Sequence, residues 1–251
     1  MRSVGLRVLA GVFAASWLVL PGFGLVDLAV TWSPDWPQVL EAGWGVFFTF
    51  LVGSPFVLVA IRPRSSAPAA VQLVVAATAL AVSAPAASEW PLLWLVALLA
   101  VQIALVGALA PPAWVVLPAA GVSAPLLALA AAGAAPWLVY ALDMWSLSRE
   151  GRPDADITMG IDHYAVQGAL GLALVALPLL AGVRAGLRPF VPACAGIAGA
   201  YLGLVSLAWP GAAGGFGRAW SGAALAWGLA LVAVALARPL GAVGARARRS
   251  A

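Results

Sequence analysis

The chain has 251 residues, of which 64% are hydrophobic and only 9% are charged. Soluble domains usually carry about 25% charged residues, so this composition excludes a water-soluble globule and indicates an integral membrane protein. One helical crossing needs about 20 apolar residues. The sequence therefore predicts an all-α, polytopic bundle of about eight transmembrane helices, which forms a single domain over residues 1–251 and leaves no soluble domain.

The predicted crossings follow one another along the chain, separated by clusters of Pro, Gly and charged residues. The first is expected to be an uncleaved span, because its apolar run is longer than a signal-peptide core and no clear cleavage site follows it. The fifth run is too long for one straight crossing, and its three prolines predict kinks or an interfacial piece ahead of the true span. The expected spans cover residues 9–26, 43–61, 69–87, 91–110, 114–141, 164–182, 190–209 and 221–237.

The distribution of charge predicts the orientation. All 13 basic residues are Arg, and with a cytoplasmic N-terminus ten of them fall in inner segments, whereas all nine acids fall outside. Since Arg-rich short loops stay in the cytoplasm, both termini are expected to be cytoplasmic. Most of the 12 Trp fall near the outer boundary, where interfacial anchoring is the ordinary role of Trp, and the alternative is that some of these rings line an outer cavity. High Ala, Gly and Arg without Lys is typical of a high-GC genome, which predicts a bacterial plasma membrane.

The two halves of the chain are weakly alike. Asp27 ends the first expected span and Glu41 precedes the second, just as Asp143 ends the fifth and Asp162 precedes the sixth. This spacing is compatible with a parallel repeat of four spans plus four. Chance is the alternative, because Arg after a span follows from topology alone. The possible halves are 1–112 and 113–251.

Several chemistries are excluded by residues that the chain lacks. Without Lys there is no retinal or pyridoxal Schiff base and no P-loop lysine, and a single His excludes a three-His zinc site. The lone Cys194 cannot form an internal disulfide. The basic balance fits cytoplasmic Arg and not nucleic-acid binding, because no basic patch with interleaved aromatics is present. We expect no cofactor and no nucleic-acid partner.

A calcium-loop template was compared with the acidic segment that precedes the sixth span. Asp154, Asp156 and Asp162 match its first, third and ninth positions. The template then fails, because Met159 stands where Gly is required and Ala165 stands where a bidentate Glu is required. No metal site is predicted from the sequence.

The segment most suggestive of function is the long outer loop from Asp143 to His163, which carries five acids and the only His. Carboxylates at span ends can simply cap helices, and this is the ordinary reading of Asp162 beside His163. The alternative is that His163 points into an outer vestibule as a base or ligand, with its partner acid on another helix. The candidate ligand-binding residues are Asp27, Glu41, Glu89, Asp143, Asp162, His163 and Gln167.

Two classes of function follow from these observations. No catalytic set is evident, so the first is a permease for a small molecule or lipid, or a membrane subunit of a larger assembly. The apolar run broken at Gly53-Ser54-Pro55 favours the permease, since broken helices can form binding sites. The second is a membrane-embedded enzyme that uses His163, Asp143 and Asp27 on a lipid-linked substrate at the outer leaflet. The lipid bilayer is the one partner common to both.

Overall fold

The computed structural model describes residues 2–63, 66–110, 120–152, 154 and 156–237. Over these ranges the chain is almost entirely helical, and seven helical segments are long and apolar enough to cross a membrane. The predicted fold class, an all-α polytopic helix bundle, is confirmed. The elements are α1 (Arg2–Leu18), α2 (Gly24–Val30), α3 (Gln38–Val46), the π-helix η1 (Phe47–Gly53), α4 (Ser54–Ile61), α5 (Ala67–Ala87), α6 (Leu92–Leu109), α7 (Ala124–Glu150), β1 (Ile157–Thr158), β2 (Ile161–Asp162), α8 (His163–Val183), the short 3₁₀ turn η4 (Ala185–Leu187), α9 (Phe190–Ala208) and α10 (Arg218–Leu236).

The first helix differs from the expected span. It begins at Arg2 and ends at Leu18, and a turn with Pro21 and Gly22 separates it from α2. Proline removes a backbone donor, and a Cβ on Gly22 would lie only 2.6 Å from the Trp17 backbone. The apolar run over residues 9–26 is therefore folded back at its end and is not one helix. With 17 residues, α1 has the minimum length for a crossing, so the eighth span stays a prediction.

Two further boundaries also differ from those expected. The second crossing runs without a break from Gln38 to Ile61, so Glu41 lies in its first turn and not ahead of it. The helix α7 begins at Ala124, directly after the N-cap residue Ser123, and ends at Glu150. This extension takes the first part of the expected outer loop into the helix. The expected start of this span at residue 114 lies outside the described residues.

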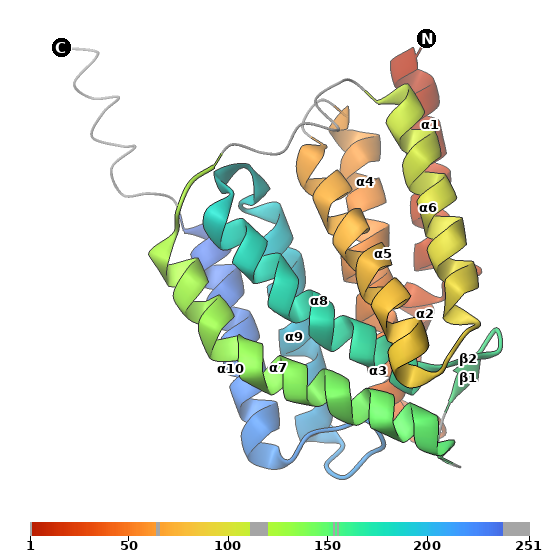
Figure 1. The fold of residues 1–251 in the computed structure, drawn as a ribbon, viewed down its shortest axis with the longest axis vertical. Helices are drawn as coiled ribbons and strands as arrows, with labels where there is room; N and C mark the ends of the chain where they lie inside the picture. The colour runs from red at the N-terminus through yellow and green to blue at the C-terminus, as the bar shows by residue number, and fades with distance from the viewer. Residues whose placement is uncertain (1, 64–65, 111–119, 153, 155, 238–251) are drawn as a thin grey trace.

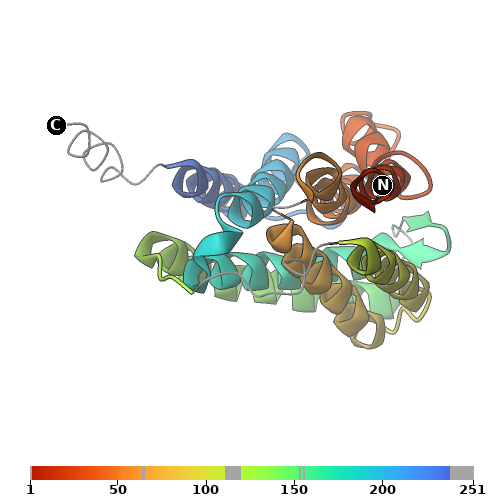
Figure 2. The ribbon, with the colours of Figure 1, turned by 90° about the horizontal axis from the view of Figure 1, so that it is seen from above.

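The helices form two layers, which are seen from above in Figure 2. One layer contains α1, the continuous α3–η1–α4 helix, α9 and α10, and the other contains α6, α5, α8 and α7. Within α1–α6, α1 contacts the α3–η1–α4 helix and α6, and α5 contacts the same two helices. The four crossings α7–α10 contact one another in the same order. The hairpin of β1 and β2 lies at the lower end of the bundle in Figure 1, opposite the N-terminus.

The middle of the second crossing widens into the π-helix η1. Pro55 has no amide hydrogen to donate to the Leu51 carbonyl one turn earlier. Gln72 of α5 compensates, because its Nε2 donates to the Phe50 oxygen at 2.8 Å and the Leu51 oxygen at 3.3 Å. The break expected at Gly53-Ser54-Pro55 is thus a bulge whose carbonyls are satisfied by a neighbouring helix.

Close packing of α9 against α10 depends on small residues. A Cβ on Gly203 would lie 2.5 Å from the Leu225 nitrogen, and one on Gly228 would lie 2.4 Å from the Ala200 nitrogen. The absence of side chains at these two positions therefore lets the two helices approach closely. This contact leaves most of the outer flank of α10 exposed.

Candidate functional sites

The hairpin at the lower end of the bundle builds the first site by placing Asp156 opposite His163. Ile157 pairs with Asp162, and Thr158 pairs with Ile161. Met159 and Gly160 form the two-residue turn, and both have positive φ, as a tight hairpin of type I′ requires. The ladder continues past β1 and β2, because the backbone amide of His163 donates to the Asp156 carbonyl at 3.0 Å. Two residues seven positions apart are thereby held side by side.

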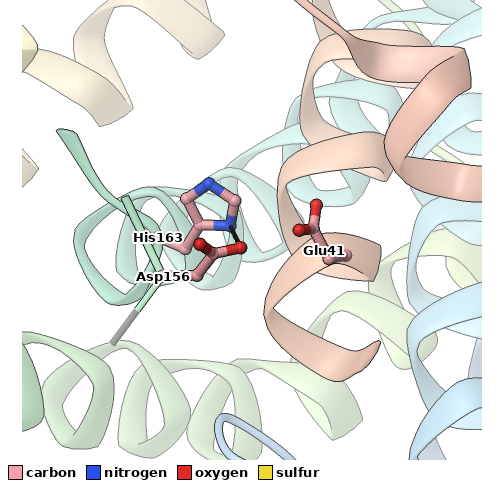
Figure 3. Close-up of side chains that lie close together, drawn as sticks. All are labelled: Glu41, Asp156 and His163. Atoms are coloured by element: carbon pink, nitrogen blue, oxygen red, sulfur yellow. Dashed lines mark ion pairs between the residues drawn. The ribbon is translucent and has the colours of Figure 1, made fainter. Parts of the chain in front are cut away.

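The imidazole of His163 is completely buried and is fixed on two sides. Its Nε2 lies 2.9 Å from the Thr158 hydroxyl, and its ring stacks on Trp44 of α3 with 4.5 Å between ring centroids. The remaining nitrogen, Nδ1, lies 3.7 Å from the Asp156 Oδ2 atom, too far for a hydrogen bond (Figure 3). Both of these facing atoms are buried, and neither has a hydrogen-bond partner among the described residues.

Glu41 completes a group of three that we call the His163 cluster: Glu41, Asp156 and His163. One ligand atom from each residue lies within 4.8 Å of the other two (Figure 3). Glu41 is buried, and it reaches the site because α3 begins at Gln38 and carries this carboxylate in its first turn. By donor type and spacing, one imidazole nitrogen and two carboxylate oxygens could bind a divalent cation.

Asp27 lies beside Glu41 and adds a third carboxyl group to the surroundings of the cluster. Burial raises the pKa of Asp27 to about 7, an effect that the neighbouring Glu41 partly opposes. Its Oδ2 atom is buried and has no hydrogen-bond partner in the described part of the chain. The short helix α2 thus places an acid with a raised pKa beside the cluster.

Two more of the predicted residues lie next to each other at the edge of this region. Asp162 caps α8, since its carboxylate accepts a hydrogen bond from the Tyr164 amide at 2.9 Å. The capping role weighed for Asp162 is therefore confirmed. Burial raises the pKa of Asp162, and burial followed by the charge of Asp162 raises the pKa of Glu89. Asp154 is exposed, and the Arg152 guanidinium lowers the pKa of its carboxyl group.

Gln167 lies one turn beyond His163, but its polar atoms are taken up by the protein. Its Nε2 donates to the Val39 carbonyl at 2.8 Å, and its Oε1 accepts from the Tyr140 hydroxyl. The side chain passes between Gly43 and Gly214, where a Cβ would lie 2.5 Å and 3.0 Å from it. The structure therefore gives Gln167 a role in joining α3, α7, α8 and the loop before α10.

Asp143 does not join the other acids and lies instead on a second site, which we call the aromatic cavity. This cavity of about 620 Å³ lies between α7, residues 215–217 and α10. Asp143 is exposed, and among the lining residues it is the one with an ionisable carboxylate. The rings that line the cavity belong to Trp137, Tyr140, Phe216, Trp220 and Trp227. Neither Asp27 nor His163 takes part.

Sequence reasoning missed Asp156 as a site residue and misread part of the Trp belt. Asp156 was considered for the failed calcium template alone, although its position seven residues before the only His was a usable signal. Trp44 and Trp137 are buried in the core, whereas Trp90 and Trp220 are more than half exposed, as interfacial anchors would be. Trp44 belongs to the surroundings of His163, and Trp137 lines the aromatic cavity together with the exposed Trp220.

No protein-family model, curated protein or solved structure matches the chain. Its function must therefore be argued from the two sites themselves.

Proposed function

We propose that this multi-span membrane protein is a permease that binds a positively charged amphiphile, a small molecule or lipid, in the aromatic cavity. The observation that supports the proposal is that five aromatic rings and one carboxylate, that of Asp143, line a cavity of about 620 Å³. Aromatic faces attract organic cations, and a single carboxylate fixes the preferred sign of charge. The volume lies in the range of small-molecule sites.

The position of the cavity favours an amphiphilic ligand over a purely polar one. It lies beside α10, whose apolar residues are mostly exposed and are expected to face lipid. Trp220 is 59% exposed at the first turn of α10, where an interfacial ring would lie near lipid headgroups. An entering molecule would place its apolar part against the rings and its charge near Asp143.

The arrangement of the crossings supports a transport role. Helices α1–α6 and α7–α10 contact one another in the same order, and the second and third crossings of each group meet those of the other. Such reciprocal contacts are expected of two parallel repeats related by an axis along the membrane normal, an architecture used by transporters. We therefore retain the four-plus-four repeat as part of the proposal.

Binding can be tested with a pair of probes that share a shape and differ in charge. The protein in nanodiscs should bind radiolabelled tetraphenylphosphonium and bind tetraphenylborate more weakly, with empty nanodiscs as the background. Asp143→Asn should weaken tetraphenylphosphonium binding roughly fivefold, equivalent to about 1 kcal/mol for a partly exposed charge pair. Asp35→Asn, which removes an exposed acid outside the cavity, is the matched control.

Uptake of tetraphenylphosphonium by proteoliposomes would then distinguish a permease from a protein that only binds. Equal binding of both probes, or an Asp143→Asn variant that binds like the wild type, would contradict the proposal. A native mass with stoichiometric partner chains would instead favour the assembly subunit predicted as an alternative.

The orientation remains part of this proposal. The hairpin, α2 and the first turn of α3 carry several of the acids and lie toward the lower end of the bundle in Figure 1, whereas the C-terminal ends of α4 and α8, which Arg62 and Arg184 follow, lie toward the upper end. The Arg-rich end should be cytoplasmic in a bacterial plasma membrane. A reporter active only in the cytoplasm should be active when fused after Arg249, and activity of an export-dependent reporter there would contradict the topology.

The His163 cluster favours a second candidate, a membrane enzyme that acts on a lipid-linked group at the outer leaflet. His163 and Asp27 lie in one region, joined by Glu41 and Asp156 in place of the predicted Asp143. An enzyme of this kind should lose activity on His163→Phe and retain it on Asp143→Asn. The opposite pattern would exclude this candidate.

A further inference from the structure

The His163 cluster contains buried acceptor atoms that no positively charged group of the described residues neutralises. The Thr158 hydroxyl occupies His163 Nε2 at 2.9 Å, so Nδ1 is the nitrogen that faces the two carboxylates. When Nε2 carries the hydrogen and donates it to the Thr158 hydroxyl, the other nitrogen, Nδ1, has a lone pair that faces Asp156 Oδ2. Two buried acceptors then face each other without a shared hydrogen.

Carboxylates increase the demand for positive charge from two sides. One oxygen of Asp156 accepts the Ile157 amide at 2.9 Å, which turns the other oxygen toward the imidazole. Glu41 brings a second carboxylate from α3, and Asp27 lies beside it. The backbone carbonyl of Leu40 also lies near the ring and adds another electronegative atom. No Arg of the described residues pairs with Glu41 or Asp156.

We propose that Glu41, Asp156 and His163 bind a first-row divalent transition-metal ion, of which zinc is the best match. An imidazole nitrogen with two carboxylate oxygens is a ligand set that zinc accepts, whereas calcium prefers an all-oxygen set. Ligands on one tetrahedral zinc lie about 3.4 Å apart, given metal–ligand distances of roughly 2.1 Å. The three ligand atoms lie within 4.8 Å of one another, so the side chains must move closer together when the ion binds.

The surroundings of the imidazole match those of known metal ligands. A metal-bound His usually donates its second ring N–H to an oxygen, which fixes its tautomer, and Thr158 provides that oxygen. Trp44 stacks on the ring and restricts its rotation. Three protein ligands leave a fourth position for water, as in catalytic zinc sites, or for the Asp27 carboxylate.

This inference is independent of the aromatic cavity, so either proposal can fail alone. The experiment uses the full chain purified in detergent and stripped with a chelator. Isothermal titration with Zn²⁺ should give one site per chain with micromolar or tighter affinity. Bound Co²⁺ should show the visible absorption of a four- or five-coordinate ion, and Ca²⁺ should not displace it.

Two variants separate ligand loss from misfolding. Glu41→Gln and His163→Phe should each weaken Zn²⁺ binding at least tenfold, and His163→Phe retains a ring for Trp44 to stack on. Asp35→Asn, which removes an exposed acid outside the cluster, should bind Zn²⁺ as the wild type does. Each protein must elute as one species by size exclusion and keep the helical circular dichroism of the wild type. A variant that fails this test is replaced by the combined Glu41→Gln, Asp156→Asn variant.

Two outcomes would overturn the proposal. Absence of a 1:1 Zn²⁺ site in the folded wild type would mean that a shared proton meets the demand for positive charge. Equal affinity in the wild type, Glu41→Gln and His163→Phe proteins would place any bound metal elsewhere.

Discussion

The His163 cluster and the aromatic cavity use the same residue types, carboxylates and aromatic rings, in opposite ways. In the cluster an aromatic ring covers the site: Trp44 is buried against His163, Glu41 is buried and Asp156 is partly buried. In the cavity the rings line an open space, and Asp143 is exposed beside it. A buried carboxylate is unstable without a cation or a proton beside it, whereas an exposed carboxylate attracts a cation only weakly. The cluster therefore suits a tightly held ion, and the cavity suits a larger, exchangeable ligand.

The largest difference should appear when the same residue type is removed from each region. Trp44→Ala deletes a buried ring that stacks on His163, packs at a tilt against Phe48 and donates to the Gly22 carbonyl at 2.9 Å. Its loss should lower the free energy of unfolding by about 3–5 kcal/mol, the range for buried aromatic residues. Trp220→Ala removes an exposed ring and should change the stability by about 0.5 kcal/mol or less.

Thermal unfolding in detergent measures the stability that Trp44→Ala loses, and ligand binding measures the effect of Trp220→Ala on the aromatic cavity. Trp220→Ala should weaken tetraphenylphosphonium binding about threefold, since an exposed cation–π contact contributes roughly 0.5–1 kcal/mol. Trp44→Phe keeps a ring beside His163 and should recover most of the stability lost in Trp44→Ala. Equal stability of the Trp44→Ala and Trp220→Ala proteins would remove the contrast between a closed site and an open one.

The fold class could be predicted because it depends on composition and span length alone. The ends of the helices could not, since they depend on tertiary contacts. The return of the chain at Gly22 depends on close approach to Trp17, and the bulge before Pro55 persists because Gln72 of another helix satisfies the freed carbonyls. Neither contact has a local signature in the sequence.

The candidate site was predictable in its residue types and only partly in its membership. Hydropathy and charge predict that the acids near span ends, such as Asp27 and Glu41, lie at one end of the bundle together with the single His163. Asp156 enters through the register of a hairpin with strands of two residues, too short to give a periodic pattern. Asp143 is not part of the His163 cluster, because α7 continues past it to Glu150 and Asp143 lines the aromatic cavity.

Gln167 offers a smaller test, because it lies between the two regions and was predicted to bind a ligand. Gln167→Leu keeps a side chain of similar size between Gly43 and Gly214 but loses the hydrogen bonds to Val39 and Tyr140. Tyr140 retains its second acceptor, the Gly214 carbonyl at 3.0 Å, which limits the penalty. The free energy of unfolding should therefore fall by about 1–2 kcal/mol, as expected for lost buried hydrogen bonds with one partner still satisfied.

If Gln167 has only this structural role, the Gln167→Leu protein should bind Zn²⁺ and tetraphenylphosphonium as the wild type does at temperatures well below its unfolding midpoint. Titrations of both ligands at such a temperature, beside thermal unfolding of the same preparations, measure the two effects separately. A tenfold loss of either affinity would return Gln167 to the ligand-binding residues. Loss of both would mean that the hydrogen bonds of Tyr140 and Gln167 couple the His163 cluster to the aromatic cavity, because Tyr140 lines the cavity and Gln167 lies one turn from His163.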